Sequence, residues 1–531
     1  MAGTDKRSEL LAIIQEHGGL TPGVARQAAE ATGVPEAHVY GTASFFHLLA
    51  DPSTKVRVCM GLSCQMDGAR ELLAEAERLG FPVAGASCLA ACDRPPAVLK
   101  DRATLVEVEK DDLTATGGDW TKLEPVAEPT DEWMGIVGPE GVPDDQLAVN
   151  LLAAPDYSGA AFAAAAKMDA EAVVETIAES GLQGRGGAGF PAGIKWRGVR
   201  AQKETTRYVV LNADEGEPGT FKDREVMLRR PDLVIEGLAI AAHTVGAQDV
   251  YLYLRGEFGA PWRHLEQAIA SFGDRLGGVR FHLHAGHGAY ICGEETALLE
   301  ALEGKRGMPR LKPPFPTENG LWGKPTLIHN VETIACVPKI IREGAAWFAG
   351  LGRTGAGTKL YCVSGHVVRP GVYELPLGVS LDELVSAAGG YVGTPYAFSP
   401  GGASSGFLPA SERGRALDFK ALAEAGSMLG SAGVVVLNDT VDLAWAVRQQ
   451  LRFFEIESCG QCAPCRIGTR FLRENVEAFL RGESDADAAA LTHAAEAAWE
   501  MNEGSICGLG QAAALPLTTT MKYFQDVFSH E

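Results

Sequence analysis

The segment ESCGQCAPCRIG, residues 457–468, places three cysteines within seven residues. Cys459, Cys462 and Cys465 are separated by two residues each. The stretches on both sides have helical periodicity, so a loop between two helices is expected to carry the three thiols. A ligand set made only of thiolates favours zinc or an iron–sulfur cluster.

A fourth cysteine helps to decide between these metals. Zinc sites usually pair one close dithiol with a second, distant pair, whereas three close thiolates and one distant cysteine are typical of a cubane cluster. Cys507, in the glycine-flanked loop GSICGLGQ, is the candidate for the fourth ligand. We therefore expect a [4Fe-4S] cluster, with structural zinc and unligated thiols as the alternatives.

A second group of cysteines lies nearer the start of the chain. Cys59 and Cys64 are separated by four residues, and Cys88 and Cys92 by three. Two close pairs at strand-to-loop junctions suit a [2Fe-2S] cluster with two ligands for each iron. Two dithiol pairs are also a zinc pattern, which is the alternative here. The other cysteines are expected to pack in the core: Cys292, Cys336 and Cys362.

Charge and hydropathy argue against several classes of protein. The 531 residues include 47 Lys and Arg against 68 Asp and Glu, a formal net charge of −21. So acidic a chain argues against binding to nucleic acid or to an anionic membrane surface. The start of the sequence has no apolar signal-peptide core, and no run of about 18 apolar residues is present, so we expect a cytoplasmic protein without a membrane span.

The order of helical and strand-like stretches predicts a multidomain α/β chain. The expected parts are a helical segment at 1–52, a small α/β module with the first cysteine group at 53–125, a linker at 126–164, an α/β domain with a central sheet at 165–350, a β-grasp-like module at 351–438 and a helical domain with the second cysteine group at 439–531.

Glycine is dense in GLQGRGGAGFPAGIKW, residues 181–196, with six glycines in 13 residues. Glycines let backbone N–H groups converge on a phosphate, and Arg185 and Lys195 add positive charge. The loop departs from the usual dinucleotide fingerprint, so a plain turn is the alternative.

An acidic cluster follows an apolar strand in NADEGEPGTFKDR, residues 212–224. Ligands usually bind at strand ends in α/β sheets. Carboxylates there can accept hydrogen bonds from ribose hydroxyls and would repel a 2′-phosphate, which favours NAD over NADP. A solvated acidic loop is the alternative. The candidate residues are Asn212, Asp214, Glu215 and Glu217.

Further candidates lie in GAYICGEETALLEALEGKRGMPRLKPPFP, residues 288–316. Glu294 and Glu295 follow Gly293 at an expected helix start, where carboxylates interact favourably with the helix dipole. Lys312 and Phe315, in the proline-rich part, would supply positive charge and stacking to a nucleotide.

Together these stretches resemble two peripheral NADH dehydrogenase subunits of respiratory complex I fused into one chain. Residues 1–125 resemble the small thioredoxin-like subunit, and residues 150–531 resemble the flavoprotein subunit through GRGGAGFPAGIKW, NADEGEPGTFKDR, GAYICGEETALLE, KPPFP, IHNVET, ESCGQCAPCRIGT and SICGLG. GGASSGFLPAS and the tail GLGQAAALPLTTTMKYFQDVF are most similar to the diaphorase (beta) subunit of soluble molybdenum- or tungsten-dependent NAD-linked formate dehydrogenases. NAD-reducing hydrogenases resemble the chain less closely.

The resemblance implies a role for each motif. The residues implied at FMN are Gly184, Arg185, Gly186, Gly187, Lys195, Asn212, Asp214, Gly293 and Asn330. Those implied at the nicotinamide nucleotide are Phe190, Glu217, Lys312 and Phe315, with Glu294 and Glu295 near its ribose and the flavin. The two cysteine groups are implied as the ligands of the [4Fe-4S] and [2Fe-2S] clusters. Two features depart from the family: His329 replaces the usual Asn before Asn330, and the gap from Cys64 to Cys88 is short.

The function that the resemblance implies is electron transfer. Hydride would pass between NAD(H) and FMN, and single electrons would pass to iron–sulfur clusters. The implied partner is a molybdopterin-type (Mo or W) catalytic alpha subunit with further iron–sulfur clusters, and electrons from formate would reduce NAD⁺. A dimer of heterodimers is the assembly considered. The alternatives are a diaphorase subunit of an NAD-reducing nickel–iron hydrogenase, an NADH dehydrogenase subunit and, outside the enzymes, a zinc-binding scaffold.

Overall fold

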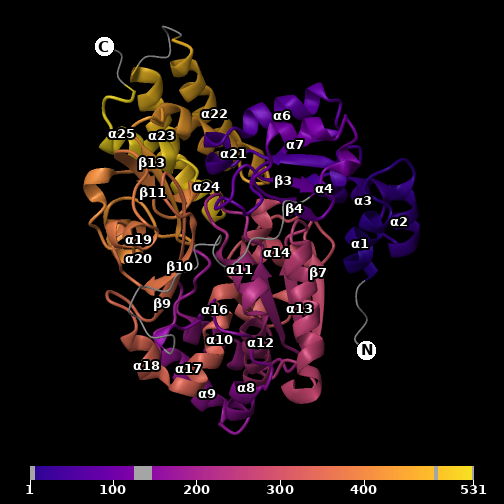
Figure 1. The fold of residues 1–531 in the computed structure, drawn as a ribbon. Coiled ribbons are helices and arrows are strands. Elements are labelled where there is room, and N and C mark those ends of the chain that lie inside the picture. The colour runs from indigo at the N-terminus through magenta and orange to yellow at the C-terminus, as the bar shows by residue number, and fades with distance from the viewer. Residues whose placement is uncertain (1–5, 125–145, 483–487, 529–531) are drawn as a thin grey trace.

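The computed structural model describes residues 6–124, 146–482 and 488–528. Its largest unit is built on a sheet of four parallel strands in the order β7-β6-β5-β8. Because the strands are parallel, their carboxyl ends meet at one edge, and this edge faces the cysteine-bearing parts of the chain (Figure 1). The strands are β5 (Tyr208–Ala213), β6 (Asp249–Leu254), β7 (Arg280–Ala285) and β8 (Thr326–Asn330).

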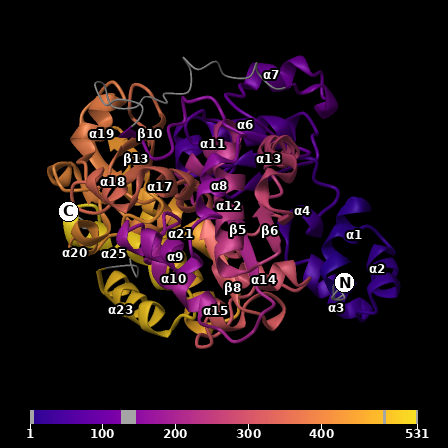
Figure 2. The same cartoon turned by 90° about the horizontal axis from the view of Figure 1, so that it is seen from below.

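Helices cover this sheet and supply most of its core. The central helix α12 (Pro231–Val245) is buried along almost its whole length and packs against β5 and β6 (Figures 1 and 2). Burial on both faces explains the apolar run of the inner strand β5, whereas the edge strand β7 is only half-buried and carries an arginine and two histidines. The other helices of this unit are α8 (Ala160–Ala165), α9 (Ala170–Glu179), α10 (Ala192–Arg200), α11 (Lys222–Arg229), α13 (Gly259–Phe272), α14 (Glu295–Leu302), α15 (Pro316–Asn319), α16 (Val331–Ala335), α17 (Val337–Glu343) and α18 (Ala345–Gly350).

The N-terminal part carries a second, smaller sheet in the order β2-β1-β3-β4. β1 (Val56–Cys59) pairs in parallel with β2 (Val83–Ala86) and antiparallel with β3 (Val98–Lys100), which pairs with β4 (Ala103–Leu105). Both cysteine pairs thus leave neighbouring strand ends, at Cys59 and shortly after Ala86. The helices here are α1 (Leu10–Glu16), α2 (Val24–Thr32), α3 (Glu36–Ala43), α4 (His47–Ala50), α5 (Leu62–Met66), α6 (Ala69–Arg78) and α7 (Lys110–Ala115).

A third sheet and a helical region complete the chain. The sheet has the order β10-β9-β13-β11-β12, in which β9 (Thr358–Gly365) and β10 (Gly371–Pro376) form an antiparallel hairpin. The other elements of this sheet unit are β11 (Pro395–Ser399), β12 (Leu408–Pro409), β13 (Gly433–Asn438), α19 (Leu381–Ala387) and α20 (Phe419–Glu424). The helical region consists of α21 (Leu443–Glu457), α22 (Ala463–Leu480), α23 (Ala488–Gly504), α24 (Gly508–Ala512) and α25 (Leu515–Tyr523).

The α/β multidomain fold expected from the sequence is confirmed by these three sheets. The expected linker, 126–164, lies partly outside the described residues. From residue 147 to 149 its side chains are buried, and the amides of Ala148 and Asn150 donate to the Glu374 carboxylate of β10, so this stretch is packed. Within the described ranges, no helix has both the length and the apolar character needed to cross a bilayer.

The close packing of α12 gives a test of the fold. A Cβ at Gly237 would lie 2.3 Å from the carbonyl oxygen of Ile334 in α16. We expect Gly237→Ala to lower the free energy of unfolding by about 1–3 kcal/mol, the usual cost of overpacking, although alanine favours helices. The control is Gly198→Ala in α10, where the added Cβ meets Thr317 at 3.5 Å; it should be neutral or stabilise by up to about 1 kcal/mol. Denaturant titration measures both, and equal effects would contradict the packing.

Candidate functional site

The candidate flavin site is built at the carboxyl edge of the parallel sheet. Asn212 at the end of β5 and Asn330 at the end of β8 are direct neighbours in the register. The Asn212 amide donates to the Gly293 carbonyl at 2.8 Å. A Cβ at Gly186 would lie 3.0 Å from Cβ of Asn330, so the glycine loop approaches the same edge. The structure therefore brings together residues from three motifs that are far apart in the sequence.

The glycine loop closes on itself beside this edge. The Gly184 amide donates to the Phe190 carbonyl at 2.8 Å, and the Arg185 amide donates to Thr333 Oγ1 at 2.8 Å. Gly187 has φ 138° and Gly189 has φ 64°, a region that favours glycine. The loop thus needs its glycines for backbone conformation as well as for close approach to Asn330.

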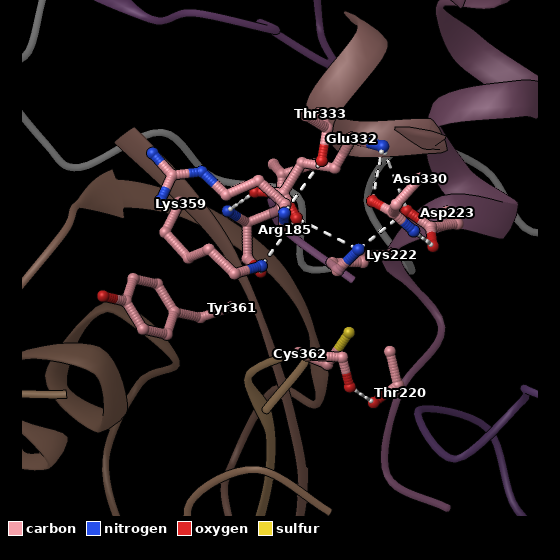
Figure 3. A network of polar contacts seen from close by, with 12 residues as sticks. Arg185, Thr220, Lys222, Asp223, Asn330, Glu332, Thr333, Lys359, Tyr361 and Cys362 are labelled. Carbon is pink, nitrogen blue, oxygen red and sulfur yellow. Dashed lines mark hydrogen bonds and ion pairs between the residues drawn. The ribbon is translucent and has the colours of Figure 1, made fainter. Parts of the chain in front are cut away.

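The Arg185 side chain points away from the loop. It is fully buried and donates to the Ala356 carbonyl at 2.7 Å, on the side of β9 (Figure 3). Two of its guanidinium nitrogens have no hydrogen-bond partner among the described residues. This placement differs from the expectation that Arg185 adds charge to the glycine loop. Only the backbone of Arg185 takes part in the loop, and its guanidinium group is buried against Ala356.

Asn330 is oriented by a buried ionic network (Figure 3). Its amide donates to Asp223 at 2.6 Å, and Asp223 pairs with Lys222 at 2.7 Å. Glu332 accepts from both Lys222 and Lys359, at 3.0 and 2.6 Å. Burial lowers the pKa of Lys359 to about 8, and Glu332 opposes this effect. The position of Asn330 therefore depends on β9, which carries Lys359.

Two lysines and two glutamates form the candidate nucleotide side of the site. Lys195 donates to Glu295 at 2.8 Å, and Lys312 bridges Glu295 and Glu294 at 2.9 and 2.8 Å. Burial alone would raise the pKa of Glu295, but the two ammonium groups outweigh it and lower that pKa to about 2. Glu294 caps α14 by accepting from the Thr296 and Ala297 amides, which confirms the expected helix start.

Two glutamates of the acidic cluster after β5 have different partners. The Glu215 carboxylate accepts the amides of Asp223 and Arg224 at 2.8 and 2.9 Å, so it caps α11. The Glu217 carboxylate instead accepts from the Tyr290 hydroxyl and from the Ser404 amide at 2.7 Å, and burial raises its pKa. The two aromatic candidates, Phe190 and Phe315, are 46% and 51% exposed, so both rings are accessible for stacking against a nucleotide.

The second cysteine group converges between three helices. Cys459 and Cys462 lie between α21 and α22, Cys465 lies in the first turn of α22 and not in the loop expected from the sequence, and Cys507 precedes α24. Burial, together with smaller contributions from the three other thiols of the group, raises the pKa of Cys465 to about 12 against the opposing effect of Ser458, so all four thiols lie near one another. A Cβ at Gly510 would lie 2.8 Å from Cys465 Cβ, so the absence of a side chain at Gly510 lets the segment after Cys507 pack closely against Cys465.

The first cysteine group converges at the end of β1. All four thiols are buried, and Cys59 adjoins both Cys64 and Cys88. The Cys59 thiol and burial raise the pKa of Cys88 to about 12, although Cys92 opposes this effect. Among the described residues, no three His, Cys, Asp or Glu side chains are arranged for a single metal ion. The donor chemistry of both groups, four thiols each, fits iron–sulfur clusters.

Polar contacts that the sequence analysis missed tie these parts together. Arg255 donates to the carbonyls of Cys88 and Glu215 at 2.5 and 2.6 Å. Arg224 pairs with Asp93 at 2.8 Å and also donates to the Ala90 carbonyl. A strand followed directly by a charged residue, as in DVYLYLRGE, was the available signal for Arg255.

Glu457, at the end of α21, was also missed. Its carboxylate accepts from the Ser87 hydroxyl and from the Tyr290 amide, the latter at 3.0 Å. Ser87 precedes Cys88, Tyr290 lies near Gly293, and Glu457 itself precedes Cys459. One buried carboxylate therefore joins both cysteine groups to the flavin edge.

Comparisons with known proteins agree with this geometry. Family models match as follows: thioredoxin-like [2Fe-2S] ferredoxin at 4–116, Nuo51 FMN-binding domain at 177–339, SLBB domain at 360–408 and NADH-ubiquinone oxidoreductase-F iron–sulfur binding region at 445–531. The NADH-quinone oxidoreductase F-subunit 2 of Rhizobium meliloti (strain 1021) is 47% identical over 374 residues, which are 67% of this chain and 87% of the relative. The F-subunit of the same enzyme from Rickettsia bellii (strain OSU 85-389) is 43% identical over 372 residues, 67% of this chain and 89% of the relative.

The chain belongs to the family of NADH-quinone oxidoreductase F-subunits.

Solved structures extend the similarity to the whole chain. A chain of an NAD⁺-reducing [NiFe]-hydrogenase in the H₂-reduced state is 32% identical, with a TM-score of 0.89, and the match covers 99% of this chain and 93% of that one. The air-oxidised state gives a TM-score of 0.87 with 99% and 94% coverage.

These findings confirm the expected cofactors: FMN, NAD, a [4Fe-4S] and a [2Fe-2S] cluster. The protein is an oxidoreductase subunit of the diaphorase type, which transfers electrons between NADH, FMN and iron–sulfur clusters. The zinc-binding scaffold is thereby excluded. The individual binding residues remain predictions, supported by the placements described above.

The charge arrangement at Glu295 makes a prediction about nucleotide selectivity. We expect Glu295→Ala to raise the ratio of kcat/KM for NADPH to that for NADH by about tenfold, because it frees Lys195 and Lys312 to pair with a 2′-phosphate. Steady-state kinetics with both nucleotides measure the ratio. Glu179→Ala, an exposed glutamate at the end of α9, is the control. An unchanged ratio in Glu295→Ala would show that this carboxylate does not face the ribose.

His329, the departure from the family pattern, makes a second prediction. The Trp196 indole, which can only donate, donates to His329 Nε2 at 2.8 Å, so the ring proton must lie on Nδ1. Burial lowers the pKa of His329 to about 3. We expect ¹⁵N NMR to show one neutral, Nδ1–H tautomer from pH 5 to 8, and Trp196→Phe to give a mixture of tautomers. A ring that is charged at pH 6 would contradict the assignment.

Proposed function

We propose that the chain is the diaphorase subunit of a cytoplasmic, NAD-linked formate dehydrogenase. In this proposal a molybdopterin-type (Mo or W) partner subunit oxidises formate, and the electrons reduce NAD⁺ here. The complex would bind neither nucleic acid nor a membrane. The FMN-binding, [2Fe-2S] and [4Fe-4S] regions within one chain support the general scheme.

One observation carries the finer assignment. The two stretches that most resemble formate dehydrogenase diaphorases, 401–411 and the C-terminal tail, lie against each other. The Phe407 amide donates to Thr519 Oγ1 of α25 at 2.9 Å. The same stretch reaches the candidate nucleotide site, where the Ser404 amide donates to Glu217. The two stretches that resemble that enzyme class therefore pack together and reach the candidate nucleotide site.

The chain's own residues position the cofactors. The glycine loop, Asn212, Gly293 and Asn330 would hold FMN, which when bound supplies the exchange between hydride and single electrons. Lys195, Lys312, Glu294 and Glu295 would orient the nucleotide, with Phe190 and Phe315 covering it. Glu457 would keep the two ligand loops at a fixed distance from the flavin edge.

A diaphorase subunit of an NAD-reducing nickel–iron hydrogenase is the second candidate. The match to that hydrogenase spans 99% of this chain, including both cysteine groups. The two candidates share the whole chemistry of this chain and differ only in the partner.

The partner decides between them. We expect anaerobic purification of the tagged chain from its native host to bring down a molybdenum- or tungsten-containing subunit, and the complex to reduce NAD⁺ with formate. Nickel in the partner and NAD⁺ reduction by H₂ would establish the hydrogenase instead. Metal analysis and mass spectrometry identify the partner.

A cysteine variant tests the route within this chain. Cys465→Ser should lose about four irons per chain and abolish formate-driven NAD⁺ reduction, because this thiol is a proposed [4Fe-4S] ligand. Cys336→Ser is the matched control: Cys336 is buried at the start of α17, no other cysteine is among the groups that shift its pKa, and its loss should leave the iron content unchanged. Full iron content in Cys465→Ser would reject the ligand assignment.

A further inference from the structure

A cavity of about 430 Å³ lies between the three cofactor-bearing parts. Ser87 and Cys88 line it from one ligand loop, Glu457 from the end of α21, and Asp214 from the end of β5. His47, which is largely exposed, also lines it. The cavity therefore extends from the protein surface to the carboxyl edge of the parallel sheet, where the candidate flavin site lies.

Two residues that line this cavity each have a buried carboxylate oxygen without a hydrogen-bond partner among the described residues. Asp214 Oδ2 and Glu257 Oε2 accept no hydrogen bond from any described residue, and both residues line the cavity. The Glu257 side chain is only 7% exposed, and its other oxygen is bound by Arg255 at 2.9 Å. An unpaired buried carboxylate oxygen is costly. We expect ordered water at the wall of this polar cavity to supply their missing hydrogen bonds.

Asp214 is the group that reaches both the cavity and the flavin edge. A Cβ at Gly293 would lie 3.8 Å from Asp214 Oδ2, so this oxygen borders a candidate flavin residue. The charged and titratable groups around Asp214 come from three sides: Arg255 and Glu257 after β6, Tyr253 on β6, Cys292 beside Gly293, and Glu457 on α21.

The surroundings of Asp214 favour its protonated form. Burial raises the pKa of Asp214 well above its usual range, Arg255 opposes this effect, and Glu257 and Glu457 add to it. A buried carboxyl group with a raised pKa that borders a polar cavity is suited to receive and pass protons.

We propose that this cavity is the proton route of the flavin site, with water as its ligand and Asp214 Oδ2 as the proton carrier. The overall reaction, NAD⁺ + 2e⁻ + H⁺ → NADH, needs one proton for every two electrons that arrive from the partner. In reverse, one proton must leave. The electrons travel through clusters that carry no proton to the flavin, so the proton needs a path of its own. The proposal rests on the proposed function, because it requires FMN beside Gly293.

The test compares two reactions of the full chain loaded with its cofactors. Bleaching of the flavin by NADH needs no proton from solvent, because hydride carries its own. Reduction of NAD⁺ by reduced methyl viologen does need one. In Asp214→Asn we expect the ratio of the second rate to the first to fall about tenfold or more. The solvent isotope effect on the second rate should rise, and imidazole, small enough to enter the cavity, should restore it.

The matched control is Asp249→Asn. Asp249 lies at the opposite end of the same sheet, where it pairs with Arg280, and its substitution should leave the ratio unchanged. An unchanged ratio in Asp214→Asn, or a fall without an isotope effect and without recovery in imidazole, would overturn the route.

Two further measurements keep the test decisive. Infrared spectra at pH 7 should show less intensity in the protonated-carboxyl region for Asp214→Asn than for the parent chain; identical intensity in the two chains would overturn the carrier. If Asp214→Asn loses FMN, the same comparison is made with Glu257→Gln. We then expect a smaller fall of the ratio, and an unchanged ratio would contradict the route. A parent chain that NADH does not bleach would reject the proposed function instead.

Discussion

Buried charges that bind partners across module boundaries fix the positions of the candidate cofactor sites relative to one another. Arg224 and Arg255 belong to the parallel-sheet unit, but they bind Asp93 and the carbonyls of Ala90 and Cys88 in the [2Fe-2S] ligand loop. Removing one partner of such a buried pair costs about 3–5 kcal/mol, whereas the intact pair adds little net stability. These contacts therefore matter less as a source of stability than as a constraint on how the modules can be placed.

The same principle sets the geometry on the flavin side. Asn330 is oriented through Asp223, Lys222 and Glu332, and the last of these also binds Lys359 of β9. The third sheet is thus part of the site, although it contributes no candidate ligand from β9 itself. A substitution of Lys359 would leave Glu332 with one cation in place of two, and the disturbance would be transmitted to Asn330 through side chains already in contact.

The sequence predicted features that rest on local patterns. Cysteine spacing placed eight thiols in two groups, and the structure brings each group together. Glycine density and the polar residues that end β5 and β8 marked the sheet edge, because parallel strands bring their carboxyl ends together. Glu294 at a helix start followed from the favourable interaction of carboxylates with the helix dipole.

Features that depend on distant pairing could not be predicted in this way. Arg185 looked like a phosphate ligand because it stands among glycines, yet its guanidinium lies under the loop and binds the Ala356 carbonyl. Glu215 stands in the acidic cluster, but it caps α11. Glu457 stands beside a cysteine motif and binds groups 167 and 370 residues away. Residue type gave the chemistry in each case, whereas the partner was fixed only by the assembled fold.

Glu457 lies where the proposed electron path and the proposed proton path meet. Its carboxylate binds Ser87, beside the first cysteine group, and Tyr290, near the candidate flavin edge, and Glu457 itself stands two residues before Cys459 of the second group. It also lines the cavity that reaches Asp214. The same contacts of Glu457 would therefore fix both the electron path and the proposed proton path. A shift that moved the clusters away from the flavin would also deform the cavity. The fusion of the modules in one chain fixes their stoichiometry, and these buried contacts fix their geometry.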